Sequence, residues 1–367
     1  MLKSGLSFHY LPDFSGDNVI CLSKSGSVYV LPASKTSLAN GPKPAETTWI
    51  PFWSSTSEVS YTPLMLPEKI TAIAAGDDHF LLLSASGKVF SAATTTDGNT
   101  FGQLGVESSP EASLLTPYPI STLPSDPVTA IAAGERHSLA LTSHGEVYSW
   151  GSNAQGQLFQ QFAKNNFSAP QPTLVPLQRL IPGLIKVVSI AAGGANSFIV
   201  ANMNTSIELY ASGSGMWGQL GSGVWNQIQH KPSRVKTLRN LSEWSDTLNR
   251  KVDIGIRYIS VGENHVAAVL DNDVSGGIGG RDVFIWGCGE AYQLGHGKRN
   301  NLNVPSPHNP IAIAEGRQGD TNAERFMLKP GRKVEIVTND GRKKNVFCEE
   351  TIVFGGGCSA VYEKIVS

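Results

Sequence analysis

The chain has 367 residues, a hydrophobic content of 40% and a formal net charge of -1 at pH 7. This length suits one large repeat domain or two ordinary domains, and the near-zero charge excludes a global attraction to nucleic acid or anionic membranes. With 38 glycines, 21 prolines and only 16% charged residues, the composition favours short strands and tight turns over a helical bundle or a disordered chain.

The N-terminal stretch has neither the apolar core of a secretory signal nor the Arg-rich pattern of a transit peptide. No apolar run reaches transmembrane length. The four cysteines form no CxxC pair and show no zinc-ligand spacing. These features indicate an intracellular protein with reduced thiols.

From Gly16 onward, one unit recurs at a step of about 60 residues, which is typical of a repeat architecture. Each unit has a small apolar strand, a glycine turn that is often followed by histidine, a second apolar strand, a polar glycine turn and an aromatic third strand. The expected first strands are 70–75, 128–133 and 187–192; the second are 79–83, 138–141 and 266–270; the third are 28–30, 89–90, 147–150 and 283–286.

A short phrase ends each unit. It reads Phe101-Gly-Gln-Leu-Gly105, Gly156-Gln-Leu-Phe159, Gly218-Gln-Leu-Gly221 and Tyr292-Gln-Leu-Gly295. Short strands joined by glycine turns predict antiparallel sheets, and stacking such sheets around an axis buries both faces of each one, as in a β-propeller. The alanine-rich first strands suit a crowded inner position, the aromatic third strands suit the space between blades, and the phrase is interpreted as a turn.

Three insertions interrupt the repeat, at about residues 35–60, 222–257 and 298–345. Long loops on a rigid scaffold commonly carry binding function. The aromatic residues of the first insertion either anchor a partner or form a satellite core, and the basic residues of the others either meet RNA or an acidic partner or stay solvated. Asn339-Asp-Gly341 predicts a hairpin turn. The candidate partner-binding residues are Trp49, Phe52, Trp53, Arg234, Lys236, Arg239, Lys298, Arg299, Arg332, Lys333, Arg342, Lys343 and Lys344.

Other site-like patterns recur with the unit and are better explained by it. Gly213-Ser-Gly215-Met-Trp-Gly218 spells GxGxxG, but no crossover helix follows, as a dinucleotide loop requires. His79, His137 and His265 share one repeat position, which favours hydrogen bonds between neighbouring strands over a metal ring. No GxSxG elbow is present. We therefore predict no catalytic residue, no bound cofactor and no metal site.

The unit from Gly134 to Phe159 resembles the repeat of the RCC1 (regulator of chromosome condensation) propellers, and the likeness covers about 16–105, 128–221 and 258–297, with a weak tail at 352–362. The resemblance implies an all-β chain and one monomeric propeller domain over 1–367, with six to seven blades of four-stranded antiparallel sheets. The family's typical ring has seven blades. Either strands from Ser7–Leu11 complete the last blade here, or an N-terminal portion with a blade and a targeting segment is missing.

A narrower likeness concerns the stretches Trp286–Asn301 and Gly357–Tyr362, which are similar to fungal mitochondrial RCC1-like proteins. That resemblance implies a mitochondrial protein linked to assembly of respiratory-chain complex III. Our first hypothesis is a non-enzymatic interaction scaffold that presents loops to a protein partner, as such an assembly factor would. One alternative is a guanine nucleotide exchange factor for a small GTPase. A second alternative is association with RNA or ribosomes, which the sparse aromatic companions of the basic residues do not favour. Cytoplasm or nucleus is the alternative compartment.

Overall fold

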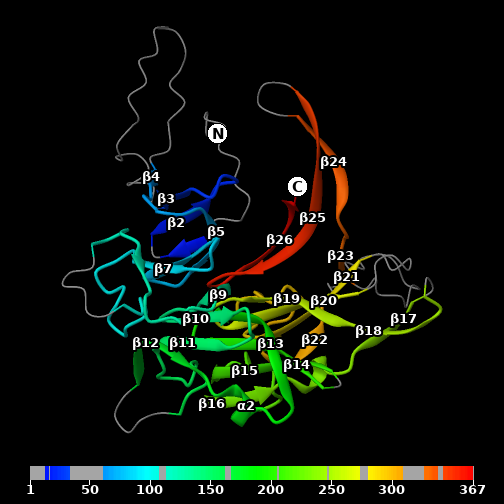
Figure 1. Ribbon diagram of the computed structural model, residues 1–367. Coiled ribbons are helices and arrows are strands. Elements are labelled where there is room, and N and C mark those ends of the chain that lie inside the picture. Colours follow the sequence, from blue (N-terminus) through cyan, green and yellow to red (C-terminus); the bar gives the residue numbers. More distant parts are fainter. Residues whose placement is uncertain are drawn as a thin grey trace. The chain divides into compact units, whose positions relative to one another are not determined.

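The structure is a computed structural model that describes residues 13–15, 17–33, 61–106, 113–161, 167–204, 206–245, 248–272, 280–308, 326–337 and 342–366. The chain divides into two compact units, which are described separately (Figure 1). Unit 1 comprises Met1–His144, Tyr148–Ser152 and Ser168–Thr173; unit 2 comprises Gly145–Val147, Asn153–Phe167 and Leu174–Ser367. That the two form one domain over 1–367 stays a prediction.

Three four-stranded antiparallel sheets lie in unit 1, apart from a few end residues of the third sheet. Their strands pair in the orders β1-β2-β3-β4, β5-β6-β7-β8 and β12-β11-β10-β9. The bounds are β1 Asp13–Ser15, β2 Asn18–Leu22, β3 Val28–Pro32, β4 Thr62–Pro63, β5 Ile70–Ala75, β6 His79–Ser84, β7 Val89–Ala93, β8 Tyr118–Pro119, β9 Val128–Ala133, β10 His137–Thr142, β11 Val147–Ser152 and β12 Ser168–Leu174.

Unit 2 holds the sheets β13-β14-β15-β16, β19-β20-β21-β22 and β24-β25-β26, and strand β23 also pairs with β21. A separate hairpin, β17-β18, lies between the first two of these sheets in the sequence and projects from them (Figure 1). The bounds are α2 Leu177–Leu180, β13 Leu184–Gly193, β14 Asn196–Met203, β15 Ile207–Gly215, β16 Asn226–Arg234, the 3₁₀ helix η1 Lys236–Leu238, β17 Ser242–Ser245, β18 Arg250–Asp253, β19 Gly255–Val261, β20 His265–Asp271, β21 Arg281–Gly287, β22 Leu302–Pro307, β23 Met327–Leu328, β24 Arg332–Val337, β25 Lys343–Phe354 and β26 Ser359–Ile365.

The predicted fold class is confirmed. The described chain is almost entirely β, and its six small antiparallel sheets have the strand order of propeller blades. Every predicted first, second and third strand is present within a residue or a few of its expected ends. The predicted hairpin around 339–341 is confirmed by the pairing of β24 with β25, although the turn itself lies outside the described residues. One departure is the last sheet, which has three strands in the described chain instead of four.

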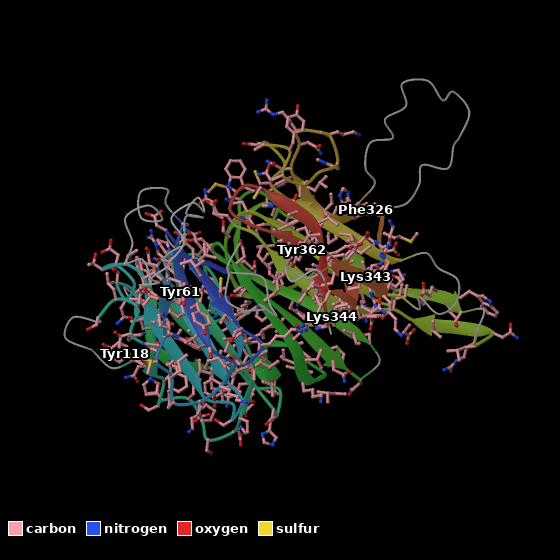
Figure 2. All side chains as sticks on the ribbon, turned by 90° about the horizontal axis from the view of Figure 1, so that it is seen from above. Tyr61, Tyr118, Phe326, Lys343, Lys344 and Tyr362 are labelled. Carbon is pink, nitrogen blue, oxygen red and sulfur yellow. The ribbon has the colours of Figure 1, made fainter. Side chains whose placement is uncertain are left out.

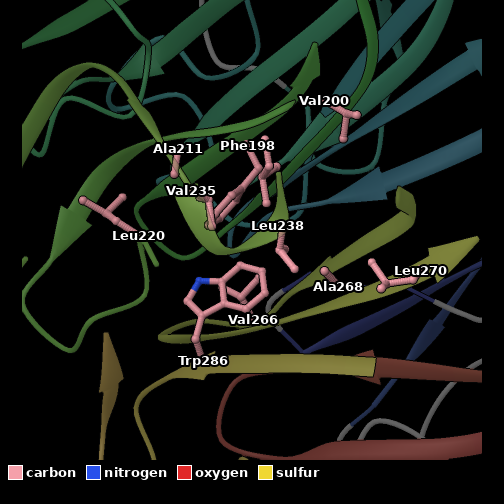
Figure 3. Close-up of a cluster of buried hydrophobic side chains, with 11 residues drawn as sticks. Phe198, Val200, Ala211, Leu220, Val235, Leu238, Val266, Ala268, Leu270 and Trp286 are labelled. Atoms are coloured by element: carbon pink, nitrogen blue, oxygen red, sulfur yellow. The ribbon is translucent and has the colours of Figure 1, made fainter. Parts of the chain in front are cut away.

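Adjacent sheets are joined by buried side chains, as predicted for the aromatic third strands. Trp150 on β11 and Trp286 on β21 are fully buried. Trp286 lies among Phe198, Leu238 and Val266, so its indole fills the layer between the sheets that contain β14 and β20 (Figure 3). The rings of Phe198 and Trp286 meet edge to face, with 6.2 Å between centroids. Such large buried aromatics dominate the hydrophobic stabilisation of a small interface.

The Gly-Gln-Leu-Gly phrase forms the same turn in all four copies. In each one the glutamine side-chain oxygen accepts the backbone N–H of the residue two positions earlier, at 2.8–2.9 Å. The first residue has a positive φ, for example +83° at Gly218, which explains the preference for glycine there. Tyr292 adopts φ 61° at this position in the last copy. The phrase is therefore a structural turn, as predicted.

Candidate interaction surfaces

The repeated histidines are buried hydrogen-bonding residues. His79 Nε2 lies 2.9 Å from Ser138 Oγ of the next sheet, and His265 Nε2 lies 3.2 Å from the backbone oxygen of Cys358. Burial lowers the pKa of both imidazoles to about 4, so they are neutral at physiological pH. Asn196, at the same repeat position, donates to the backbone oxygen of Ser214. The Asn196 bond joins neighbouring strands as predicted, whereas the two histidines bond the backbone or side chain of a different sheet.

The GxGxxG sequence at Gly213 belongs to the sheet. Gly213 lies in β15 with φ +119°, and a Cβ there would come within 2.1 Å of the backbone oxygen of Ala195. Gly218 is the first residue of the repeat turn. The glycines are thus required by close backbone approach, which agrees with the interpretation of this stretch as part of the repeat.

Within the described ranges, no group of three or more His, Cys, Asp or Glu residues could hold a metal ion. In the same part of the chain, no helix is long and apolar enough to cross a membrane.

Two arginines of the second insertion, Arg234 and Arg239, contact an acid that the sequence did not single out. Glu208, near the start of β15, is buried, and its Oε1 lies 3.3 Å from Arg234 Nη1 and 2.8 Å from Arg239 Nε. Tyr210 donates its hydroxyl to Glu208 Oε2 at 2.7 Å. Lys236, in η1 between the two arginines in sequence, is exposed. The structure therefore brings Arg234 and Arg239 together on Glu208.

These contacts set the charge of the cluster. Burial, the largest single effect, acts to raise the pKa of Glu208, but the Tyr210 hydrogen bond, the two guanidinium groups and Ser206 together hold it below its usual value. Burial and the hydrogen bond to Glu208 raise the pKa of Tyr210 to about 12. At neutral pH, the cluster thus holds a carboxylate, a protonated tyrosine and two cations.

The basic residues of the third insertion do not form one surface. Arg299 donates to the backbone oxygen of Glu290 at 2.7 Å, its guanidinium lies over the ring of Tyr292 at 5.8 Å, and neighbouring Lys298 is exposed.

The remaining candidate partner-binding residues lie on the hairpin of β24 and β25, and Lys343 and Lys344 are the first two residues of β25 (Figure 2). Arg332 pairs with Glu363, and Lys343 Nζ lies 2.9 Å from Glu335 Oε1. Lys333, Arg342 and Lys344 are exposed. The acidic neighbours reduce the positive charge that this hairpin could offer to RNA. The aromatic candidates Trp49, Phe52 and Trp53 lie outside the described residues.

An apolar surface that the sequence did not predict lies beside the third copy of the phrase. We call Met216, Val224, Trp225 and Val304 the Trp225 patch; all four are exposed, Trp225 by 52%. Trp225 packs over the backbone of the turn, since a Cβ on Gly218 would lie 2.9 Å from its ring, and Gly223 N donates to Asn303 O at 2.8 Å. The sequence signal was the extra Ser222–Trp225 segment immediately after the phrase.

A second exposed tryptophan lies on the projecting hairpin. Trp244 on β17 is 58% exposed and pairs across the strands with Lys251 on β18. The hairpin is anchored near its base by Asn272, which donates to Glu243 at 3.0 Å. Residues 222–257, expected as an inserted loop, thus contain β16, η1 and this hairpin.

Comparison with known proteins agrees with the repeat. Models of the Regulator of chromosome condensation (RCC1) repeat match residues 128–157, and residues 98–141, 144–200 and 282–314. The chain belongs to the RCC1-like repeat family.

Individual relatives differ widely in length from this RCC1-like chain. It is 32% identical over 283 residues to the human protein named Probable E3 ubiquitin-protein ligase HERC3, covering 77% of this chain and 23% of HERC3. It is 26% identical over 296 residues to the dog (Canis lupus familiaris) X-linked retinitis pigmentosa GTPase regulator, covering 68% of this chain and 26% of that protein. The chain thus spans about a quarter of the length of these relatives.

The solved structure of Prp20p from Saccharomyces cerevisiae, described with its binding to Gsp1p and histones, has a TM-score of 0.60 to this chain at 20% identity. The match covers 95% of this chain and 67% of Prp20p. At that identity, the likeness concerns the fold.

Proposed function

We propose that this RCC1-like chain is a non-enzymatic scaffold that binds a protein partner through the Trp225 patch. The observation that carries the proposal is the concentration of four exposed apolar side chains, three beside the turn at Gly218 and the fourth, Val304, on the adjacent strand β22. Contiguous exposed apolar residues commonly mark protein interfaces, and tryptophan is enriched among the residues that contribute most to binding. The buried repeat residues, by contrast, are engaged in packing and hydrogen bonds within and between the sheets.

Affinity purification with chemical cross-linking tests this function. The tagged wild-type chain is expected to retain a partner whose cross-links fall near Trp225, and Trp225→Ser is expected to lose it. Two matched variants serve as controls: Trp244→Ser removes the other exposed tryptophan of unit 2, and Met65→Ser removes an apolar side chain that is 89% exposed in unit 1. Retention of the partner by Trp225→Ser, with loss in either control, would refute this assignment.

As to partner and compartment, we propose an assembly intermediate of respiratory-chain complex III in mitochondria. Support comes from the resemblance of Trp286–Asn301 and Gly357–Tyr362 to fungal mitochondrial RCC1-like proteins. Cell fractionation and native gels of cells lacking the protein test it. The proposal expects the chain in the mitochondrial fraction and a loss of mature complex III; a cytoplasmic or nuclear protein with normal complex III would refute it.

A guanine nucleotide exchange factor is the second candidate. It is favoured by the name of the canine relative, a GTPase regulator, at 26% identity. Fluorescent-nucleotide release from a panel of small GTPases tests this alternative. Release that accelerates in proportion to the amount of this chain would support it, and unchanged release from every GTPase would leave the scaffold as the function.

A further inference from the structure

Arg234 and Arg239 hold a geometry that a surface cation pair does not ordinarily keep. Arg234 Nη1 and Arg239 Nε both contact the same oxygen, Oε1 of Glu208, at 3.3 and 2.8 Å. Sharing one oxygen holds the two guanidinium groups close together. The carboxylate is fixed in turn by the Tyr210 hydroxyl at 2.7 Å and by Ser206 Oγ at 3.3 Å. A long arginine side chain ordinarily loses much rotamer freedom when it binds a ligand. Because Glu208 already restricts both arginines in the free protein, less conformational entropy is lost on binding.

The pair carries more positive charge than Glu208 requires. One guanidinium would balance the single carboxylate, so the second leaves a net positive charge at the cluster, and Lys236 is exposed nearby in the sequence. The two arginine side chains are 40% and 44% exposed, which leaves N–H groups open to solvent. Convergent guanidinium groups with free N–H donors suit a phosphate, because its oxygens accept several charge-assisted hydrogen bonds at once.

We propose that Arg234 and Arg239, held by Glu208, form a binding site for the phosphate group of a phosphorylated side chain in a partner protein. A nucleic acid fits less well, because a polynucleotide needs cations along a track of phosphates and aromatic faces for its bases. The aromatic residue of the cluster, Tyr210, is buried, and the two arginines converge on one point. Recognition of phosphorylated segments by clustered arginines follows this chemistry.

This site is separate from the Trp225 patch. Glu208 is the second residue of β15, whereas Met216 directly follows the last residue of that strand, Gly215. The two surfaces therefore lie at opposite ends of one strand, roughly 25 Å apart at the rise of an extended chain. Because of that separation, loss of phosphate binding and loss of the partner at Trp225 are measured independently.

The test follows the arginine Nε–H signals of the whole chain by NMR as inorganic phosphate is added, then as a phosphoserine peptide and its unphosphorylated form are added. Saturable shifts of Arg234 and Arg239 are expected with phosphate and with the phosphoserine peptide. Arg257, which is bonded to Glu349 at 3.0 Å in another sheet, is the internal control and should not shift. Equal shifts of all three arginines, or no shift at 234 and 239, would overturn the site.

Two variants separate positioning from bulk charge. Arg239→Lys keeps the charge but loses the planar donor set, so phosphopeptide affinity should fall by about tenfold. Glu208→Gln removes a negative charge, which bulk electrostatics predicts would tighten binding; the positioned pair should instead bind more weakly, also by about tenfold. Melting temperatures confirm folding of each variant. Tighter binding by Glu208→Gln, or stronger binding of a single-stranded oligonucleotide than of the phosphopeptide, would contradict the proposal.

Discussion

The indole Nε1 of Trp150 donates a hydrogen bond of 2.9 Å to the backbone oxygen of Gln103, the glutamine of the Gly-Gln-Leu-Gly turn that precedes it in the chain. Trp286 makes the same bond to Gln219, at 2.8 Å. The repeated geometry links the third strand of one sheet to the turn of the sheet before it. The turn and the tryptophan thus act together to fix neighbouring sheets within each unit.

Trp286→Phe is expected to destabilise the protein because it leaves the Gln219 oxygen buried without its indole donor and empties part of the core. The free energy of unfolding should fall by about 2–3 kcal/mol. Trp225→Phe, at an exposed position, is the matched control and should change it by less than about 0.5 kcal/mol. Urea denaturation measures both. Equal effects of the two variants would show that the indole bond does not fix the sheets.

The sequence predicted many of the first three strands of the sheets, but β1, β14 and β19 were not among the expected strands, and the fourth strands were missed. The first three have dense apolar or aromatic patterns, such as β10 at His137–Thr142. The fourth strands are the outer ones, are mostly half-buried or exposed, and all contain proline, as in β12, β16 and β22. Proline is tolerated because an outer strand leaves some N–H groups unpaired, but it also removes the usual strand signal.

The candidate sites were predictable only in part. The insertions and their arginines were visible in the sequence, whereas the partner of Arg234 and Arg239 was not. Glu208 lies inside a repeat strand, Ile207–Gly215, and its role depends on a chain reversal that brings β16 beside β15. The Trp225 patch could not be predicted from the sequence either. Whether an apolar side chain is exposed depends on tertiary packing, here on Gly218 and Asn303, which lie beneath Trp225.

Gly218→Ala and Gly223→Ala separate backbone strain from crowding, because the two glycines have nearly equal φ of +83° and +82°. A Cβ at 223 would meet its nearest atom at 3.5 Å, which is ordinary contact. The free energy of unfolding of Gly223→Ala should therefore fall only by the cost of a left-handed backbone at a non-glycine residue, about 1–2 kcal/mol. A Cβ at 218 would lie 2.7 Å from Asn303 Cα, so the backbone must shift and at least about 1 kcal/mol more should be lost. Thermal unfolding compares them. Equal losses would mean that the close approach at Gly218 is unimportant.

Acid should destabilise the fold through its buried histidines. His79 and His265 have pKa values of about 4 in the folded chain against an ordinary value of 6.5. Above pH 6.5 the two histidines are neutral in both the folded and the unfolded chain, so they cost the fold no stability. As the pH falls from 6.5 toward 4, the unfolded chain takes up protons that the folded chain does not, so stability falls by up to about 3 kcal/mol per histidine.

The control for acid destabilisation is His79→Asn, which installs the residue that the chain uses at position 196. Urea denaturation between pH 7 and pH 4 should show a shallower loss of stability in this variant. Glu208 contributes in a different window: its lowered pKa gives stability above its ordinary value of 4.5 that is lost only at lower pH. An unchanged pH profile in His79→Asn would assign the acid sensitivity to other groups.

The affinity of the chain for the partner identified by cross-linking, measured at equilibrium for the wild type and for Trp225→Ser, tests the scaffold function most directly. A tryptophan at the centre of an interface contributes about 2 kcal/mol or more, so the Kd should rise by about thirtyfold or more while the melting temperature is unchanged. A Kd within about twofold of the wild-type value, in a variant that folds normally, would contradict a scaffold that binds through the Trp225 patch.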